Sequence, residues 1–183
     1  TEFAFSDEGI ADLFLDATLP TYLEDDLHMY LEWVKYPLAV RSSSLLEDGQ
    51  FRPYAGLYKT YMLPNNSPDI NERVKQLCIA VKLIYASVFY EGPRAFSRTT
   101  LHRTEEEKMG IIIQRLTGQE HNDHFYPALS GTAQSHNFYP IQYMNSKEGI
   151  AHIALGLGKI VVDGGQAIRF SPSYPQLLPQ FSS

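Results

Sequence analysis

Residues 38–43 read Leu-Ala-Val-Arg-Ser-Ser, and this short stretch decides the fold that we predict. Its first three residues are apolar, which is typical of a mostly buried strand, and Pro37 predicts that the preceding helix ends there. The strand then ends in polar groups, of which Arg41 is the first. Because a buried arginine is costly unless it is paired, Arg41 is the first candidate for a functional residue.

A second strand is expected over residues 56–63, after a loop rich in Glu, Asp, Gly and Pro. The run Pro-Asn-Asn-Ser-Pro at 64–68 would stop it, because these residue types favour turns. The two strands are therefore predicted to pair as a hairpin.

Three helices are predicted around this hairpin, because apolar residues recur there at intervals of three or four. The first starts at Ser6, and the second covers about residues 21–35. The longest covers about residues 69–90, with Asp69 as its N-cap and Glu72 in a capping-box position. A Gly-Pro pair directly after this helix marks its end.

The second half of the chain changes to runs of β-branched residues separated by Gly, Pro, Ser and Asn. Strands are predicted there over four ranges: 110–116, 138–143, 149–155 and 167–170. A helical first part and a β-rich second part predict an α+β fold, with lobes at residues 1–108 and 109–183.

Composition excludes several classes of partner. With 183 residues, 44% of them hydrophobic, the chain can bury a substantial core. A formal net charge of -6 gives no basic stripe to follow a phosphate backbone, so no nucleic acid partner is expected. Nor is membrane association expected, because no apolar run approaches the roughly 18 residues that span a bilayer. The single cysteine, Cys78, indicates a small buried side chain in a reducing compartment, the cytoplasm.

Arg41 has two interpretations on spacing alone. Its planar guanidinium could meet a phosphate, while small residues nearby let backbone amides approach the same anion. Equally, it could form an internal ion pair with Glu47 or Asp48. Spacing does not decide between the two.

The segment around Arg41 resembles a pattern of the phosphoenolpyruvate synthase and pyruvate phosphate dikinase family, VRSSATAED followed by a short loop and FAGQ-x-[DE]-TF. The matching residues are Val-Arg-Ser-Ser at 40–43, Glu-Asp at 47–48, Tyr-Ala-Gly at 54–56 and Thr-Tyr at 60–61. Three later segments follow in the family's order: 112–116 is similar to VVQxM, 130–131 to SGV, and 156–164 to GLGE-x-VV-x-G. The resemblance covers about residues 38–165.

This resemblance implies an ATP-grasp fold, in which two lobes hold ATP between them, with residues 1–183 forming part of that nucleotide-binding domain. It implies that Arg41 is a catalytic residue that pairs with the phosphates, and that the Gly56 backbone and the Thr60 hydroxyl line the loop covering them. Gln114 would lie beside the nucleotide and the Leu116 backbone near the adenine. Without the resemblance, Thr60 and Gln114 are ordinary strand residues and Gly56 is a turn residue.

The chain also departs from the family pattern. Lys59 stands at an acidic position, and Lys159 replaces the glutamate of GLGE. The family's amino-terminal phosphate-binding lysine, and its later acidic strand with a Q-x-R segment, have no counterpart here. Because phosphoryl transfer needs carboxylates that hold Mg²⁺, we expect Mg²⁺ to bind only in the full-length protein and the fragment alone to be inactive.

Two further motifs carry little weight. Gly-Leu-Gly-Lys at 156–159 is not a P-loop, which needs a longer glycine spacing and a Ser or Thr after the lysine. His121, His124 and His136, with Asp123, match no metal-site spacing and are expected in a solvated loop.

Three functions of the parent protein stay open. It could be a phosphoenolpyruvate synthase-like enzyme that transfers phosphate from ATP to pyruvate through a phosphohistidine, a phosphotransferase with another acceptor, or a regulatory module that retains only the fold. The expected partners are ATP and the remaining domains of the parent chain. A homodimer formed through exposed aromatic side chains is the alternative to core packing of four residues: Phe125, Tyr126, Phe138 and Tyr139.

Overall fold

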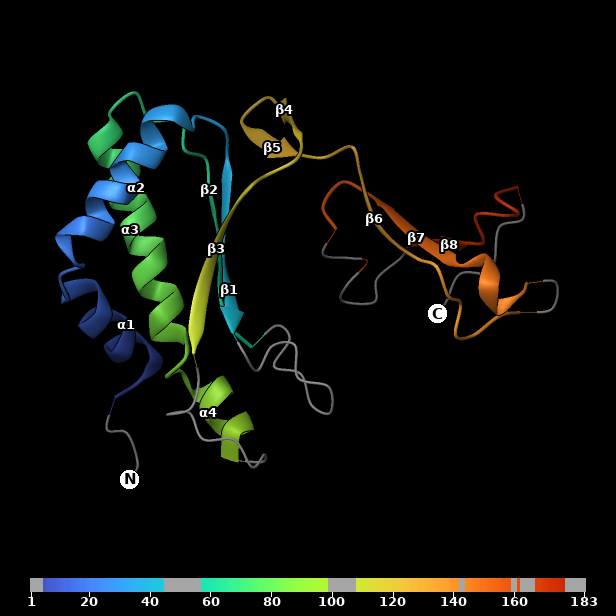
Figure 1. Ribbon diagram of the computed structural model, residues 1–183, viewed down its shortest axis with the longest axis horizontal. Helices are drawn as coiled ribbons and strands as arrows, with labels where there is room; N and C mark the ends of the chain where they lie inside the picture. Colours follow the sequence, from blue (N-terminus) through green and yellow to red (C-terminus); the bar gives the residue numbers. More distant parts are fainter. Residues whose placement is uncertain are drawn as a thin grey trace. The chain divides into compact units, whose positions relative to one another are not determined.

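The computed structural model describes residues 5–44, 57–98, 108–141, 144–158, 161 and 167–176. The chain divides into two compact units, Thr1–Leu116 and Thr117–Ser183. Figure 1 shows the first unit as helices packed on a sheet and the second as strands with little helix. This combination confirms the predicted α+β class.

The first unit consists of a three-stranded antiparallel sheet of order β2-β1-β3 with helices packed against it. Figure 1 shows α1, α2 and α3 on one side of this sheet. The elements of the unit are α1 (Asp7–Asp16), α2 (Thr21–Trp33), β1 (Leu38–Ser44), β2 (Thr60–Leu63), α3 (Ile70–Ser87), α4 (Glu91–Arg98) and β3 (Met109–Arg115). The predicted hairpin of β1 with β2 is therefore confirmed. Strand β3, which lies beyond the expected lobe boundary at 108/109, pairs with β1 in this unit.

The core of the first unit lies between the helices and one face of the sheet. Leu38 and Val40 on β1 have no exposed surface, and they pack with Leu31 of α2 and with Leu77 and Ile84 of α3. Apolar residues from β2 and β3 pack against the same cluster: Tyr61, Leu63, Met109, Ile111 and Ile113. Alternate residues on all three strands thus point to the helices, as expected for a sheet covered on one face.

The helix boundaries follow from their capping residues. The Ser6 hydroxyl accepts a hydrogen bond from the Gly9 amide, and the Asp69 carboxylate accepts one from the Asn71 amide. The capping box predicted with Glu72 does not form, because the Asp69 amide donates to the Ser67 hydroxyl instead.

The long helix predicted to reach residue 90 ends at Ser87, and a separate helix, α4, follows it. Proline was expected to end the helix, yet Pro93 is the third residue of α4. That position is in the first turn, where no amide donor is required. The Asp7 carboxylate accepts a hydrogen bond from the Glu91 amide at 2.8 Å, which caps the start of α4.

The strand expected over residues 56–63 begins only at Thr60 in the described residues. Residues 57–59 instead pack on the end of α3. Tyr58 is buried against Val88, and the Lys59 amide lies 3.5 Å from the Ser87 hydroxyl that accepts its hydrogen bond. The burial of the Tyr58 ring against Val88 thus takes the place of strand pairing before Thr60.

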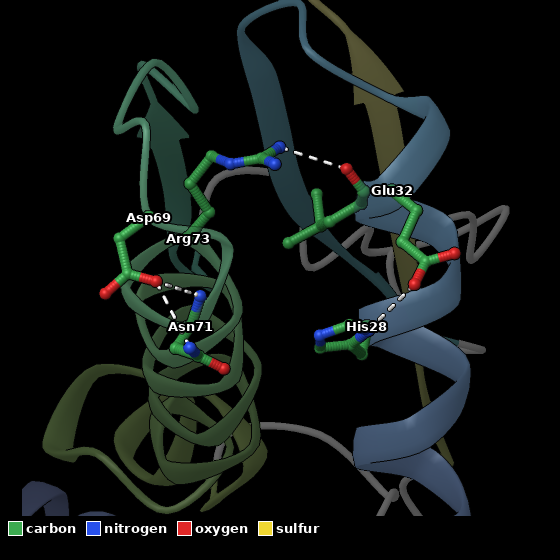
Figure 2. A network of polar contacts seen from close by, with 6 residues as sticks. His28, Glu32, Asp69, Asn71 and Arg73 are labelled. Atoms are coloured by element: carbon green, nitrogen blue, oxygen red, sulfur yellow. Dashed lines mark hydrogen bonds and ion pairs between the residues drawn. The ribbon is translucent and has the colours of Figure 1, made fainter.

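Arg73 on α3 is buried, and its guanidinium hydrogen-bonds the backbone at the carboxyl end of α2, as Figure 2 shows. Its Nη1 donates to the carbonyl oxygens of Leu31 and Val34 at 3.0 and 3.1 Å. Asn65, which follows β2, donates through Nδ2 to the carbonyl oxygens of Val34 and Tyr36, both at 3.0 Å. The last carbonyls of a helix have no partner within it, so these two side chains supply the missing donors. The arginine charge also suits the negative end of the helix dipole.

The second unit contains a two-stranded sheet, β4-β5, and a three-stranded antiparallel sheet of order β6-β7-β8. Its elements are β4 (Gln119–His121), β5 (His124–Tyr126), β6 (Leu129–Gln134), the 3-10 helix η2 (Ser146–Glu148), β7 (Ile150–Leu155) and β8 (Ile168–Phe170). The predicted strands over 149–155 and 167–170 are confirmed to within one residue. The other three strands were not predicted.

The strand predicted over residues 138–143 is wrong for the described residues 138–141, which form a bend. The buried Asn137 side chain accepts a hydrogen bond from the Tyr139 amide at 3.1 Å, and this local turn replaces a strand ladder. Phe138 and Tyr139 are 71% and 78% exposed, so the core packing expected of them is also wrong, whereas Phe125 and Tyr126 are half-buried.

Cys78 is a free, buried cysteine on α3, as predicted. Burial raises the pKa of its thiol, which keeps it protonated at neutral pH. In the described part of the chain, no helix has both the length and the hydrophobicity needed to span a membrane.

Replacing Arg73 with alanine is expected to lower the free energy of unfolding by about 2–4 kcal/mol, because the Leu31 and Val34 carbonyls lose a buried donor. Lys75→Ala, on an exposed position of the same helix, should change it by less than about 0.5 kcal/mol. Urea unfolding of both variants followed by circular dichroism measures the difference. Equal stability of the two would contradict the role given to Arg73.

Candidate functional site

The face of the β2-β1-β3 sheet turned away from the helices gathers the residues singled out from the sequence. We call it the open face. By strand alternation and register it consists of Ala39, Arg41, Ser43, Thr60, Met62, Gly110, Ile112 and Gln114. The neighbouring residues Leu38, Val40 and Tyr61 point to the core instead. Burial raises the pKa of the Tyr61 hydroxyl, as expected on the covered face.

Arg41 lies at the centre of the open face. It is directly opposite Thr60 on β2 and directly opposite Ile112 on β3. Opposite residues in antiparallel strands have Cα atoms roughly 5 Å apart, so the Thr60 hydroxyl lies within reach of the arginine side chain. The sheet thus brings together two of the predicted site residues that are 19 positions apart in the chain.

Gln114 lies on the same face, one step along the sheet. It is opposite Ala39, and Ala39 is in turn opposite Met62 on β2. The small Ala39 side chain between them is buried. Three predicted site residues therefore share one surface: Arg41, Thr60 and Gln114.

Sequence reasoning missed the apolar part of this surface. Met62 is 62% exposed and Ile112 is 39% exposed, although both are large hydrophobic residues in a sheet that has a well-packed core. The signal that could have found them is strand alternation, since each lies an even number of residues from Thr60 or Gln114. The open face thus combines one cation, two hydroxyls and an amide with exposed apolar side chains.

Leu116 follows β3 directly. Its backbone amide donates a hydrogen bond to the Pro37 carbonyl oxygen at 2.9 Å, which extends the pairing of β3 with the segment before β1. A ligand contact through this amide would have to replace that bond. The neighbouring Arg115 guanidinium lies 5.0 Å from the centre of the Tyr36 ring, a cation–π distance.

Several residues weighed from the sequence fall outside the described part of the chain, among them Gly56, Glu47 and Asp48. The ion pair between Arg41 and either carboxylate is therefore not tested. Arg41 itself is exposed at the end of the buried stretch of β1. The departure at Lys59 falls next to Thr60, where the Lys59 side chain is exposed, while the departure at Lys159 lies outside the described residues.

Of the three histidines expected in a solvated loop, His121 and His124 belong to a hairpin, whereas His136 is exposed and lies in no helix or strand. His121 is the last residue of β4, and His124 is the first residue of β5. Asn122, in the turn between them, has a positive φ of 55°. The His121 ring is half-buried and stacks on Tyr126 with ring centres 4.2 Å apart. Within the described ranges, no three side chains of His, Cys, Asp or Glu are close enough to hold a metal ion.

In the second unit, two of the sequence motifs meet. The Ser130 hydroxyl donates to the Gly156 carbonyl oxygen at 2.6 Å, and the Gly156 amide donates to the Ala128 carbonyl oxygen at 3.0 Å. Gly156 has a positive φ of 74°, a conformation that favours glycine. Hydrogen bonds thus join the Ser-Gly segment at 130–131 to the Gly-Leu-Gly segment at 156–158, at one end of the β6-β7 ladder.

Comparison with known proteins places these elements in a family. The family model for the AMP/ATP-binding domain of pyruvate phosphate dikinase matches residues 2–178. The chain belongs to this family of nucleotide-binding domains, which confirms the resemblance seen in the sequence.

The chain is also 29% identical over 127 residues to an uncharacterized phosphotransferase, YvkC, of Bacillus subtilis (strain 168). The match covers 69% of this chain and 13% of that relative. The chain therefore spans a small part of the length of a phosphotransferase that it resembles.

The two faces of the sheet should respond differently to the same kind of substitution. Val40→Thr, which buries a hydroxyl in the core, is expected to lower the free energy of unfolding by about 1–3 kcal/mol. Ile112→Thr on the open face should cost less than about 1 kcal/mol, because the hydroxyl can reach water and threonine retains a branched side chain suited to strands. Urea unfolding measures both, and a larger cost for Ile112→Thr would contradict an open face.

Proposed function

We propose that the open face of the first unit forms part of an ATP-binding cleft, and that the parent protein is an ATP-dependent phosphotransferase. The observation that carries this proposal is the placement of Arg41 directly opposite Thr60, with Gln114 on the same face. Membership of the AMP/ATP-binding family supports the choice of nucleotide.

Each residue of the open face has a chemical role in this proposal. The Arg41 guanidinium offers a planar fork of donors to the phosphate oxygens, and the Thr60 hydroxyl donates beside it. The Gln114 amide can both donate and accept, as recognition of a base or sugar edge requires. Exposed apolar groups at Met62 and Ile112 provide contact for the flat, largely apolar base. Gly56 and the Leu116 backbone complete the site as proposed from the family pattern.

In this proposal, Mg²⁺ binds only in the full-length parent protein. The eight residues of the open face contain no carboxylate, and carboxylates are what Mg²⁺ prefers. The open face by itself therefore does not fit a magnesium site. Arg41 acts here by holding and neutralising phosphate charge.

For the parent protein, we propose phosphoryl transfer from ATP in the manner of phosphoenolpyruvate synthase, with pyruvate as acceptor and a phosphohistidine in between. Support comes from the family match and from the phosphotransferase relative, of which this chain covers only a part. In this proposal the domains that select the acceptor lie elsewhere in the parent chain, and the protein is cytoplasmic. A homodimer through the exposed Phe138 and Tyr139 is a further element of the proposal.

The alternative function is a regulatory or scaffold module that retains the fold without turnover. The observation that favours it is Lys59, an exposed cation beside Thr60 where the family pattern has an acid. ATP binding without ATP hydrolysis or phosphoryl transfer by the full-length parent would support this alternative.

Calorimetric titration of ATP with Mg²⁺ tests the proposed site, with this chain and with the full-length parent protein. Arg41→Ala is expected to weaken ATP binding by about ten- to a hundredfold, because a charge-assisted contact to phosphate is lost.

Lys75→Ala is the matched control, since it removes an exposed positive charge, as Arg41→Ala does, but from α3. It should leave ATP affinity unchanged. Equal ATP affinity of the Arg41→Ala variant and the wild-type parent protein would contradict the proposed site. An absence of ATP binding by the wild-type parent would overturn the nucleotide proposal altogether.

A further inference from the structure

Three side chains of the second unit lie in one row across the β6-β7-β8 sheet. His152 on the central strand is directly opposite Thr132 on β6 and directly opposite Arg169 on β8. Directly opposite residues project from the same face of a sheet, so the hydroxyl, the imidazole and the guanidinium are neighbours. We call these three residues the polar row.

On its own face the polar row is flanked by the buried apolar residues Ile150 and Ala154 of β7, and the other face of the sheet is apolar. Strand alternation places a run of hydrophobic residues there: Leu129, Ala133, Ala151, Ile153, Leu155, Ile168 and Phe170. In the polar row, three hydrogen-bonding side chains stand at the same register position on three successive strands.

Arg169 is held in place within the row. Its side chain is half-buried, and Nη2 donates to the Tyr139 carbonyl oxygen at 3.3 Å. No acidic side chain of the described residues lies within ion-pair distance of it, although the chain has 21 acidic residues. The guanidinium has further N–H donors that a ligand's acceptor oxygens could meet.

Among the described residues, the charged group that shifts the pKa of the His152 imidazole is a cation, Arg169. Burial first, and then the positive charge of Arg169, lower the pKa of the His152 imidazole, so the ring is neutral at pH 7. A neutral imidazole can donate one hydrogen bond to an acceptor that lies over this face of the sheet. Its backbone is fixed closely against β6, because a Cβ at Gly131 would overlap the His152 carbonyl oxygen.

We propose that Thr132, His152 and Arg169 form a binding site for a phosphate-type oxyanion on the second unit. The three groups supply one fixed positive charge and donors of different reach, which suits a tetrahedral anion with several acceptor oxygens. The anion could be inorganic phosphate or a phosphate group of a nucleotide, and the chemistry of recognition is the same for both. The site does not depend on Arg41.

The test follows the His152 ring signals by NMR at pH 7 while inorganic phosphate, ATP or adenosine is added to the chain. We expect saturable shifts with inorganic phosphate or with ATP, and none with adenosine. Shifts with inorganic phosphate identify a site for the free anion, whereas shifts with ATP alone identify a site for nucleotide phosphates. His124, exposed in the β4-β5 hairpin, serves as the internal reference and should not respond.

Arg169→Gln is expected to weaken the anion affinity by about ten- to a hundredfold, and Lys147→Gln, an exposed cation of the same unit, should leave it unchanged. Thr132→Val removes a hydroxyl at an exposed strand position and keeps a β-branched side chain, with an expected loss of about three- to tenfold. The proposal is overturned if neither phosphate nor ATP moves the His152 signals, if His124 responds equally, or if Arg169→Gln and Thr132→Val both bind as the wild type does. Arg41→Ala should leave these shifts unchanged, which separates this site from the proposed ATP cleft.

Discussion

The alternation of side chains along β1 is the constraint on which the rest of the first unit depends. Leu38 and Val40 have no exposed surface because α2 and α3 cover them, and this burial fixes which way the strand faces. A shift by one residue would expose both of them and bury the Arg41 charge. Burial of two aliphatic side chains therefore decides where the only charged group of the open face can point. The neighbouring strands follow, because their apolar residues pack on the same helices and leave Thr60 and Gln114 on the opposite side.

The sequence predicted most of the first unit because its signals are local. Apolar spacing and capping residues identified α1, α2, α3 and the β1-β2 hairpin, and the family pattern singled out Arg41, Thr60 and Gln114. What it could not predict depends on contacts between distant residues. Tyr58 leaves the strand to pack against Val88, and Asp7 caps a helix that begins 84 residues later at Glu91. Arg73 was not singled out from the sequence, yet it is buried and donates to carbonyl oxygens at the end of α2.

In the second unit, local signals were weaker. The β4 and β5 strands have three residues each, and their polar composition gave no period-two pattern. Ser130 and Gly131 were noticed only as a motif, although the structure gives a physical reason for both. Ser130 donates to the Gly156 carbonyl, and Gly131 permits the close approach of the His152 carbonyl oxygen. The polar row was invisible in the sequence, because strand register alone brings Thr132, His152 and Arg169 together.

Three consecutive isoleucines on β3 allow a direct test of the nucleotide-binding face. Ile112 lies on the open face opposite Arg41, whereas Ile111 and Ile113 pack against the helices. Methyl-labelled NMR of the isoleucines during ATP titration reports on all three positions in one experiment. Binding at the proposed site predicts a saturable shift of the Ile112 methyl signal, with smaller shifts at Ile111 and Ile113. Saturable ATP binding that leaves the Ile112 signal in place would contradict the account.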